Sequence, residues 1–441
     1  MTTTRSSPLT RFLTWAAPIE PRETSAVVAA FSLFFFMWAG YFSVRPVRET
    51  IGTLLGRDAV ADLWLYTAAF SILIVPLYGT VVGRFRRSTF LPWAYGVVAA
   101  VLALVGVSLS TTEFSPLVGK AYYVFISVVN LFLLSNFWSF LLELFDRGQA
   151  KRLFGVIAAG GSAGALAGPL VSDLTVNSIG EKGLLFVAAG LFLAALVCQR
   201  LLLKVWSGRA GTAVANEDRP IGGSWFAGIP IILRSPYLLG ICLFIVGISA
   251  VSTILYFEQL RIVAVTFAET NARTQIFARM DWIVQSLTVL TQIFLTGRIA
   301  AHFGVTTLLT AVPLVMILGF LALAAGSGGF VLFAAVFILR RAGEYALVRP
   351  GREMLWSPLD KETKYKAKNT VDVPVYRGAD YVGAQANSAL AVLGVTPAGV
   401  MVIGAVVAAL WGVVGWWLGR RFETGATAAR VAQPVARESQ A

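Results

Sequence analysis

Apolar runs of about 20 residues recur along the whole of this 441-residue chain and constrain its fold more than any other feature. Each run is long enough to cross the hydrocarbon core of a bilayer as an α-helix. The composition agrees, because 57% of the residues are hydrophobic and only 13% are charged, whereas soluble domains carry about 25% charged residues. The sequence therefore predicts an all-α membrane protein that crosses the bilayer many times.

The apolar runs predict twelve transmembrane helices. They lie at residues 25–46, 60–83, 89–110, 117–144, 153–175, 182–204, 236–257, 276–297, 303–325, 328–348, 373–394 and 397–419. No signal peptide with a convincing small-residue cleavage site precedes any of them, so we expect the first run to remain as a transmembrane helix.

Lysine and arginine are distributed unevenly around these runs. If the N-terminus is cytoplasmic, the cytoplasmic side holds 25 of the 36 basic residues, the opposite side holds 8, and 3 lie within the runs. The positive-inside rule then predicts that both termini are cytoplasmic. The formal net charge of +13 is explained by this topology, so no nucleic-acid partner is predicted. We expect an integral protein of a bacterial inner membrane.

The two halves of the chain repeat at a constant offset. Gly83-Arg84 corresponds to Gly297-Arg298, and Asp146-Arg147 corresponds to Asp360-Lys361. Two pseudo-symmetric six-helix halves in parallel orientation are typical of the major facilitator architecture, whose substrate site lies between the halves. The predicted parts are an N-terminal segment (1–24), a first half (25–205), a linker with an interfacial segment (206–235), a second half (236–420) and a tail (421–441).

Small residues line one face of the fifth run. Gly160, Gly164 and Gly168 are spaced four positions apart, which places them along one ridge of a helix. Such a ridge lets two membrane helices approach closely. We therefore interpret it as a helix-packing surface rather than a phosphate-binding loop.

Ionisable residues near or within apolar runs are costly in a bilayer and mark functional candidates. Three ionisable residues lie at the end of the first run and share one face of a helix: Arg45, Arg48 and Glu49. They are either functional groups or anchors that snorkel to the interface. At the matching depth of the seventh run, Glu258 precedes Arg261. Glu258 is a coupling or gating carboxylate, a partner for Arg48, or the start of a solvated loop.

The tenth run contains Arg340, Arg341 and Glu344. Arg340 and Glu344 are four positions apart and can pair within one helix, whereas Arg341 points elsewhere and is a candidate for the cavity. A structural ion pair accounts for one of these arginines but not for both.

The eleventh run contributes Asp372, Arg377 and Asp380. Arg377 either contacts substrate or is balanced by one of the two aspartates or by Glu344. Arg279 and Asp281 of the eighth run lie near its outer end, where a structural role is favoured.

The segment Pro358-Leu-Asp-Lys-Glu-Thr-Lys-Tyr-Lys-Ala-Lys-Asn-Thr-Val-Asp372 concentrates positive charge in a predicted cytoplasmic loop. Its lysines include Lys364, Lys366 and Lys368. A cluster of this kind attracts polyvalent anions. Arginine forks bind phosphate oxygens in a bidentate manner, while lysine acts as a point charge. The charges placed along this chain therefore favour an anionic substrate.

The same segment resembles the loop P-L-D-x-x-T/S-K-x-K-x-K-x-x-I/V-D of the ATP/ADP translocases. These are nucleotide exchange transporters of plastids and intracellular bacteria, related to the major facilitators. Arg45-x-x-Arg48-Glu49 is similar to the family's R-x-x-K-D, and Gln149-Ala-Lys-Arg-Leu-Phe is similar to its E-A-K-R-F-Y. Arg48 replaces a lysine of the pattern and Gln149 replaces an acidic residue. The resemblance extends from about Phe31 to Val414.

The resemblance implies exchange of ATP and ADP, or related nucleotides, by alternating access and without hydrolysis. The substrate-binding candidates are Arg45, Arg48, Arg341, Arg377, Lys364, Lys366 and Lys368. The coupling or gating candidates are Glu49, Glu258, Glu344, Asp372 and Asp380. We expect a lipid-embedded protein that functions as a monomer and requires no cofactor.

No enzymatic activity is predicted. The chain contains no G-x-x-x-x-G-K-[ST] phosphate loop, no H-E-x-x-H motif and no nucleophile elbow. Its single histidine, His302, cannot build a metal site alone, and Cys198 and Cys242 lie in apolar runs that suggest no disulfide. Two other functions stay open: transport of another organic anion or of a proton-coupled solute, with Glu258 or Asp281 as the coupling group, and a membrane scaffold or sensor without transport.

Overall fold

The computed structural model describes residues 19–84, 87–111, 115–206, 228–326, 328–359, 367–368 and 370–438, and their regular secondary structure is helical throughout. Lys364 and Lys366 lie outside these residues. Judged by length and composition, seven segments of the described chain are apolar enough to cross a membrane. They are Thr24–Leu55, Pro92–Leu109, Pro116–Leu144, Gly148–Trp206, Pro236–Thr266, Thr270–Ala324 and Pro397–Gly425. The predicted class of an all-α membrane protein is therefore confirmed.

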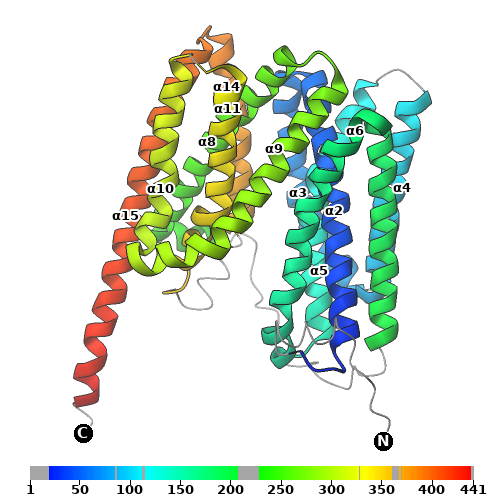
Figure 1. The fold of residues 1–441 in the computed structure, drawn as a ribbon. Helices are drawn as coiled ribbons and strands as arrows, with labels where there is room; N and C mark the ends of the chain where they lie inside the picture. The colour runs from blue at the N-terminus through cyan, green and yellow to red at the C-terminus, as the bar shows by residue number, and fades with distance from the viewer. Residues whose placement is uncertain are drawn as a thin grey trace, which may run out of the picture. The chain divides into compact units, whose positions relative to one another are not determined.

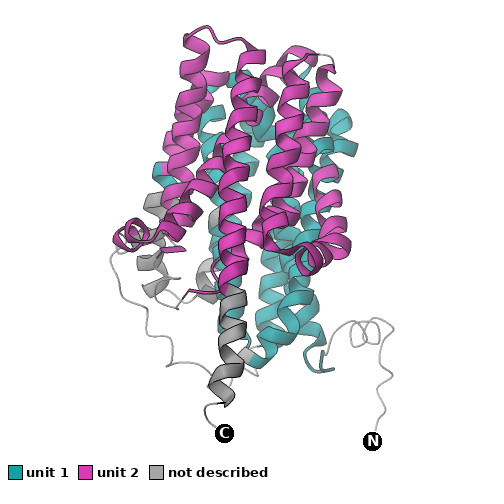
Figure 2. Ribbon diagram, turned by 90° about the vertical axis from the view of Figure 1, so that its left-hand side faces the viewer, with its two compact units in different colours: residues 1–55, 69–219, 267–282 teal, residues 56–68, 220–266, 283–441 magenta. Residues whose placement is uncertain are grey.

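The helices form two compact units, coloured separately in Figure 2. Unit 1 contains α2 (Thr24–Leu55), the part of α3 (Arg57–Arg84) from Ala69 onward, α4 (Arg87–Thr111), α5 (Pro116–Leu144), α6 (Arg147–Trp206) and α9 (Thr270–Thr291) as far as Trp282. Unit 2 contains the remainder of α3 and α9 together with α7 (Gly228–Arg234), α8 (Pro236–Thr266), η1 (Gln292–Thr296), α10 (Gly297–Ala324), α11 (Gly329–Gly343), η2 (Glu344–Val348), α12 (Arg349–Met354), η3 (Val371–Val375), α14 (Tyr376–Val392) and α15 (Pro397–Glu438).

Each unit includes one short segment from the other half of the sequence. Residues 56–68 belong to unit 2, and residues 267–282 belong to unit 1. The offset that relates Gly83 to Gly297 carries 56–68 onto 270–282, so the two exchanged segments occupy equivalent places in the repeat. The exchange is reciprocal.

Two glycines with positive φ end helices at equivalent places in the repeat. Gly180 interrupts α6 with φ 69°, and Gly394 separates α14 from α15 with φ 72°. This backbone region is readily available only to glycine. The offset between these two glycines equals the offset between Gly83 and Gly297. Gly304, with φ 78°, breaks α10 in the same way.

Within unit 1, α2 and α6 pack closely along the predicted glycine ridge, and Figure 1 shows them running side by side. A Cβ on Gly160, Gly164 or Gly168 would lie 2.4, 2.2 or 2.6 Å from a backbone carbonyl oxygen of α2. Real Cβ atoms do not approach a backbone so closely, so only glycine fits. The helix-packing interpretation is confirmed. The consequence for function is that α2, which carries Arg45 and Arg48, is held firmly against α6.

Candidate substrate-binding site

The first cluster lies in unit 1 on the second half of α2. This helix continues to Leu55, beyond the apolar run, so Arg45 and Arg48 lie inside a helix and not at its end. Arg45 donates to both carboxylate oxygens of Asp281 at 2.6 Å and lies 3.5 Å from Glu49. Arg48 forms an ion pair with Glu49 and donates to Ser127 Oγ at 3.1 Å. Its guanidinium also lies over the ring of Tyr123, 5.3 Å from the centroid.

This arginine cluster is compact and protected from solvent. Glu49 is only 3% exposed, and it is shared between the two arginines. Charged groups at such a depth are stable only when paired. The structure therefore supplies Arg45 and Arg48 with internal counter-charges, and Asp281 proves to be the partner of Arg45.

Sequence reasoning missed Asp173 of α6. Its carboxylate accepts hydrogen bonds from Arg279 at 2.9 and 3.2 Å and from the indole of Trp282 at 2.9 Å. The signal was present, because Asp173 is a lone carboxylate inside an apolar run. Nearby, Thr274 hydrogen-bonds to Thr50 at 2.6 Å and donates to Glu181 at 2.7 Å. The segment of α9 in unit 1 is thus fastened to α2 and α6 by several polar contacts.

The second cluster lies in unit 2 around the π-helical turn η2. The predicted pair forms, with Arg340 3.1 Å from Glu344, and Arg340 also donates to Ser252. Arg349 contacts the other oxygen of Glu344 at 3.3 Å. This contact was not predicted, because a regular α-helix places positions i and i+5 on different faces. The wider π turn, in which the Arg349 N–H bonds to the Glu344 carbonyl, brings them together.

Arg341 is buried beside aromatic rings of the same helical segment. Its guanidinium lies 5.6 Å from the ring centroid of Phe337 and 5.9 Å from that of Tyr345. Arg349 lies 4.3 Å from the Tyr345 centroid. Such contacts stabilise a guanidinium away from water. Arg340 and Arg349 share the single carboxylate of Glu344, so this pairing carries more positive than negative charge.

The candidates of α14 are paired within unit 2. Arg377 lies 3.5 Å from Asp380, which also accepts a hydrogen bond from Ser249 at 2.6 Å. Of the partners predicted for Arg377, the structure pairs it with Asp380. Asp372 lies 3.5 Å from Arg352.

Lys368 pairs with Glu353 at 2.5 Å. Burial raises the pKa of the Glu353 carboxyl, but the hydrogen bond and charge of Lys368, together with Arg352, outweigh burial and leave the pKa below its ordinary value. Burial also raises the pKa of Asp372, and there it prevails over Arg352 and Lys368. The described end of the lysine-rich segment is therefore a mixed acidic and basic cluster.

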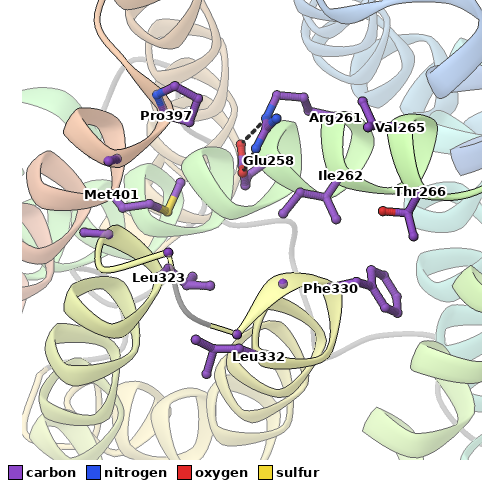
Figure 3. A pocket seen from close by; sticks show the side chains of 15 residues that line it. Glu258, Arg261, Ile262, Val265, Thr266, Leu323, Phe330, Leu332, Pro397 and Met401 are labelled. Carbon is purple, nitrogen blue, oxygen red and sulfur yellow. Dashed lines mark hydrogen bonds and ion pairs between the residues drawn. The ribbon is translucent and has the colours of Figure 1, made fainter.

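Glu258 borders a pocket of about 350 Å³ in unit 2, shown in Figure 3. Arg261 donates to both of its oxygens, at 2.9 and 2.5 Å. The loop-start alternative for Glu258 is wrong, because α8 continues to Thr266. Apolar side chains of α8, α10, α11 and α15 complete the walls, including Ile262, Leu323 and Met401. The volume is at the lower end of the range of small-molecule sites.

Comparison with known proteins shows what the chain is similar to. The profile of the TLC ATP/ADP transporter family matches residues 254–423. The ADP,ATP carrier protein 1 of Chlamydia muridarum (strain MoPn / Nigg) is 23% identical, over 86% of this chain and 84% of its own length. The ADP,ATP carrier protein 1 of Chlamydia trachomatis serovar D is 22% identical over the same shares. The chain is therefore similar to the TLC ATP/ADP transporter family over residues 254–423, and to two ADP,ATP carriers over most of its length.

Solved structures show the same fold at low identity. The nucleoside transporter NupG superposes with a TM-score of 0.63 and 14% identity, covering 90% of this chain and 99% of its own. A bacterial homologue of the iron transporter ferroportin, in an inward-facing state, gives a TM-score of 0.66 and 13% identity, covering 90% and 98%. The chain therefore has the fold that these two transporter structures share.

Proposed function

We propose that this protein is an ATP/ADP translocase, which exchanges nucleotides across a membrane, ATP for ADP or a related pair, by alternating access and without hydrolysis. The observation that carries the proposal is the family match over residues 254–423, which contain the arginine cluster around η2. A polyvalent phosphate chain is the natural ligand for several guanidinium groups held at depth.

Carboxylates occupy the arginine forks that a phosphate chain would bind. Glu49 and Asp281 neutralise Arg45 and Arg48, and Glu344 neutralises part of its cluster. An incoming nucleotide competes with these carboxylates for the arginine forks. The substrate-binding set is completed by Arg341 and Arg377, and the anion is steered toward it by Lys364, Lys366 and Lys368. The counter-charges or gating groups are Glu49, Glu258, Glu344, Asp372 and Asp380.

The architecture proposed for this exchange has twelve transmembrane helices in two six-helix halves. We place residues 25–205 and 236–420 in the halves, residues 206–235 in the linker, and both termini in the cytoplasm of a bacterial cell. The protein acts as a monomer in the inner membrane, with neither enzymatic activity nor a nucleic-acid partner.

Counterflow in proteoliposomes tests the proposal. Vesicles preloaded with unlabelled ADP are expected to accumulate labelled ATP, and vesicles without internal nucleotide are not. Arg48→Gln and Lys368→Gln are expected to reduce uptake, whereas Arg200→Gln, at an exposed position of α6, removes the same charge and serves as the control. Uptake that needs a proton gradient but no internal nucleotide would reject nucleotide exchange in favour of a proton-coupled solute.

A further inference from the structure

A buried carboxylate outside the predicted site lies where α2 and α6 begin. Glu23 of unit 1 is 3% exposed. Arg152 donates to both of its oxygens, at 2.9 and 3.2 Å, and Gln149 donates to one of them at 3.1 Å. The Glu20 N–H donates to the other at 3.1 Å. Charge-assisted hydrogen bonds of this kind are about twice as strong as neutral ones. Glu23 thus joins the start of α2 to the first turns of α6.

The orientation of Gln149 is fixed from its other side. Its backbone N–H donates to Asp146 Oδ1 at 2.8 Å, and its side-chain oxygen accepts from the Asp146 N–H at 3.2 Å. This reciprocal pair is a capping box that closes the start of α6. With its oxygen committed to Asp146, the Gln149 amide group is left to face Glu23. The side chain therefore bridges the helix cap and the buried carboxylate.

A glutamate at position 149 would satisfy the same capping box but not the bridge. It would place a carboxylate oxygen about 3 Å from the Glu23 oxygen, and two carboxylates at such a distance do not both ionise. An amide at position 149 and a carboxylate at position 23 are therefore complementary. In this chain the carboxylate lies on the segment that leads into α2, and the amide lies at the start of α6.

We propose that Glu23 is the positioning carboxylate at this end of unit 1, acting from the start of α2 on Arg152 and Gln149. It orients Arg152 and keeps α2 in register with α6. The register matters for transport because α2 carries Arg45 and Arg48 in its second half. Gln149 is then the amide partner that this carboxylate requires. The transport part of this inference rests on the proposed nucleotide exchange.

A charge-swap experiment tests the inference. Glu23→Gln removes the carboxylate, Gln149→Glu adds a repelling one, and the double variant E23Q/Q149E restores one acid and one amide at exchanged positions. Each single variant is expected to lower the kcat of ADP/ATP exchange at least tenfold with little change in KM, because Glu23 does not touch substrate. The double variant is expected to recover most of kcat. Glu20→Gln is the matched control, since the Glu20 side chain is 65% exposed and contacts Arg152 at the longer distance of 3.4 Å.

A second readout does not depend on transport. Ala26, fully buried in the first turn of α2, is replaced by cysteine in a background without Cys198 and Cys242, and the alkylation rate of the new thiol is measured in purified protein. The single variants are expected to react at least tenfold faster, and the control and the double variant at the original rate. If a single variant does not fold, recovery of folded yield in the double variant replaces this comparison.

Two results would overturn the inference: a Glu23→Gln variant that behaves as the original protein, or a double variant no better than either single one. A third result would uphold the positioning role and reject the proposed function. In that result, the double variant restores the slow alkylation of the thiol at position 26, but neither the original protein nor any variant exchanges nucleotides.

Discussion

Replacing Glu344 by glutamine should convert a partly neutralised arginine site into one that depends on substrate anions for its stability. Glu344 is buried and lies 3.1 Å from Arg340 and 3.3 Å from Arg349. Removing one partner of a buried ion pair costs about 3–5 kcal/mol. Glutamine keeps the shape and one acceptor, so the loss from Arg340 is expected at the lower end of that range.

The contribution of Arg349 is smaller. Its side chain is 50% exposed, and a solvent-screened pair contributes less than about 1 kcal/mol. We therefore expect a total loss of about 3 kcal/mol. Since about 1.36 kcal/mol corresponds to a factor of ten, the folded-to-unfolded ratio falls roughly 100-fold. With an unfolding entropy of about 2.1 cal/mol/K per residue, Tm falls by about 3 °C.

Thermal unfolding of the purified protein, with and without saturating ADP, measures this effect. ADP supplies the missing negative charge, so it should raise the Tm of Glu344→Gln by more than it raises that of the original protein. Glu353→Gln is the control, because Glu353 is 47% exposed and its loss should change stability by less than about 1 kcal/mol. An equal ADP-induced shift in both proteins would show that Glu344 is only a structural brace. An unchanged Tm without ADP would show that the pair is not stabilising.

Asp281→Asn should release the α9 segment from Arg45. A cysteine that replaces the buried Ala278 should then be alkylated at least tenfold faster. An unchanged rate would show that the other contacts of the segment hold it in place. Gly164→Ala should destabilise the protein by about 1–3 kcal/mol, because the new Cβ would lie 2.2 Å from a backbone oxygen. Gly155→Ala is the control, because a Cβ there would meet open space. Equal Tm values for the two variants would contradict the prediction. The pKa of Glu353 is lowered in the folded protein. The Glu353 carboxylate therefore stabilises the fold above about pH 4.3, and this effect is lost as the pH falls through the folded-state pKa. The Tm difference between the original protein and Glu353→Gln should stay constant from pH 8 to about 5 and vanish in stronger acid.

Local spacing predicted part of the fold and part of the candidate site. The Arg340–Glu344 pair and the glycine ridge of α6 depend on positions three or four apart, which helical geometry fixes. Sequence alone did not reveal that Asp281 holds Arg45, because the two lie in distant parts of the chain and meet only through packing. The contact of Arg349 with Glu344 was missed for a different reason. It requires a π turn, which no residue pattern in the sequence predicts.

The reciprocal exchange of residues 56–68 and 267–282 has a consequence for the order in which the protein is made. Arg45, Asp173 and Glu181 emerge early from the ribosome, yet each has a partner in the segment 267–282. Unit 1 is therefore incomplete from the time its last main helix ends at Trp206 until Trp282 has been added. At about 5–20 residues per second, that interval is roughly 4–15 s. During it, three charged groups stand without their final partners, and a chain truncated before residue 267 remains in that state as a substrate for membrane quality control.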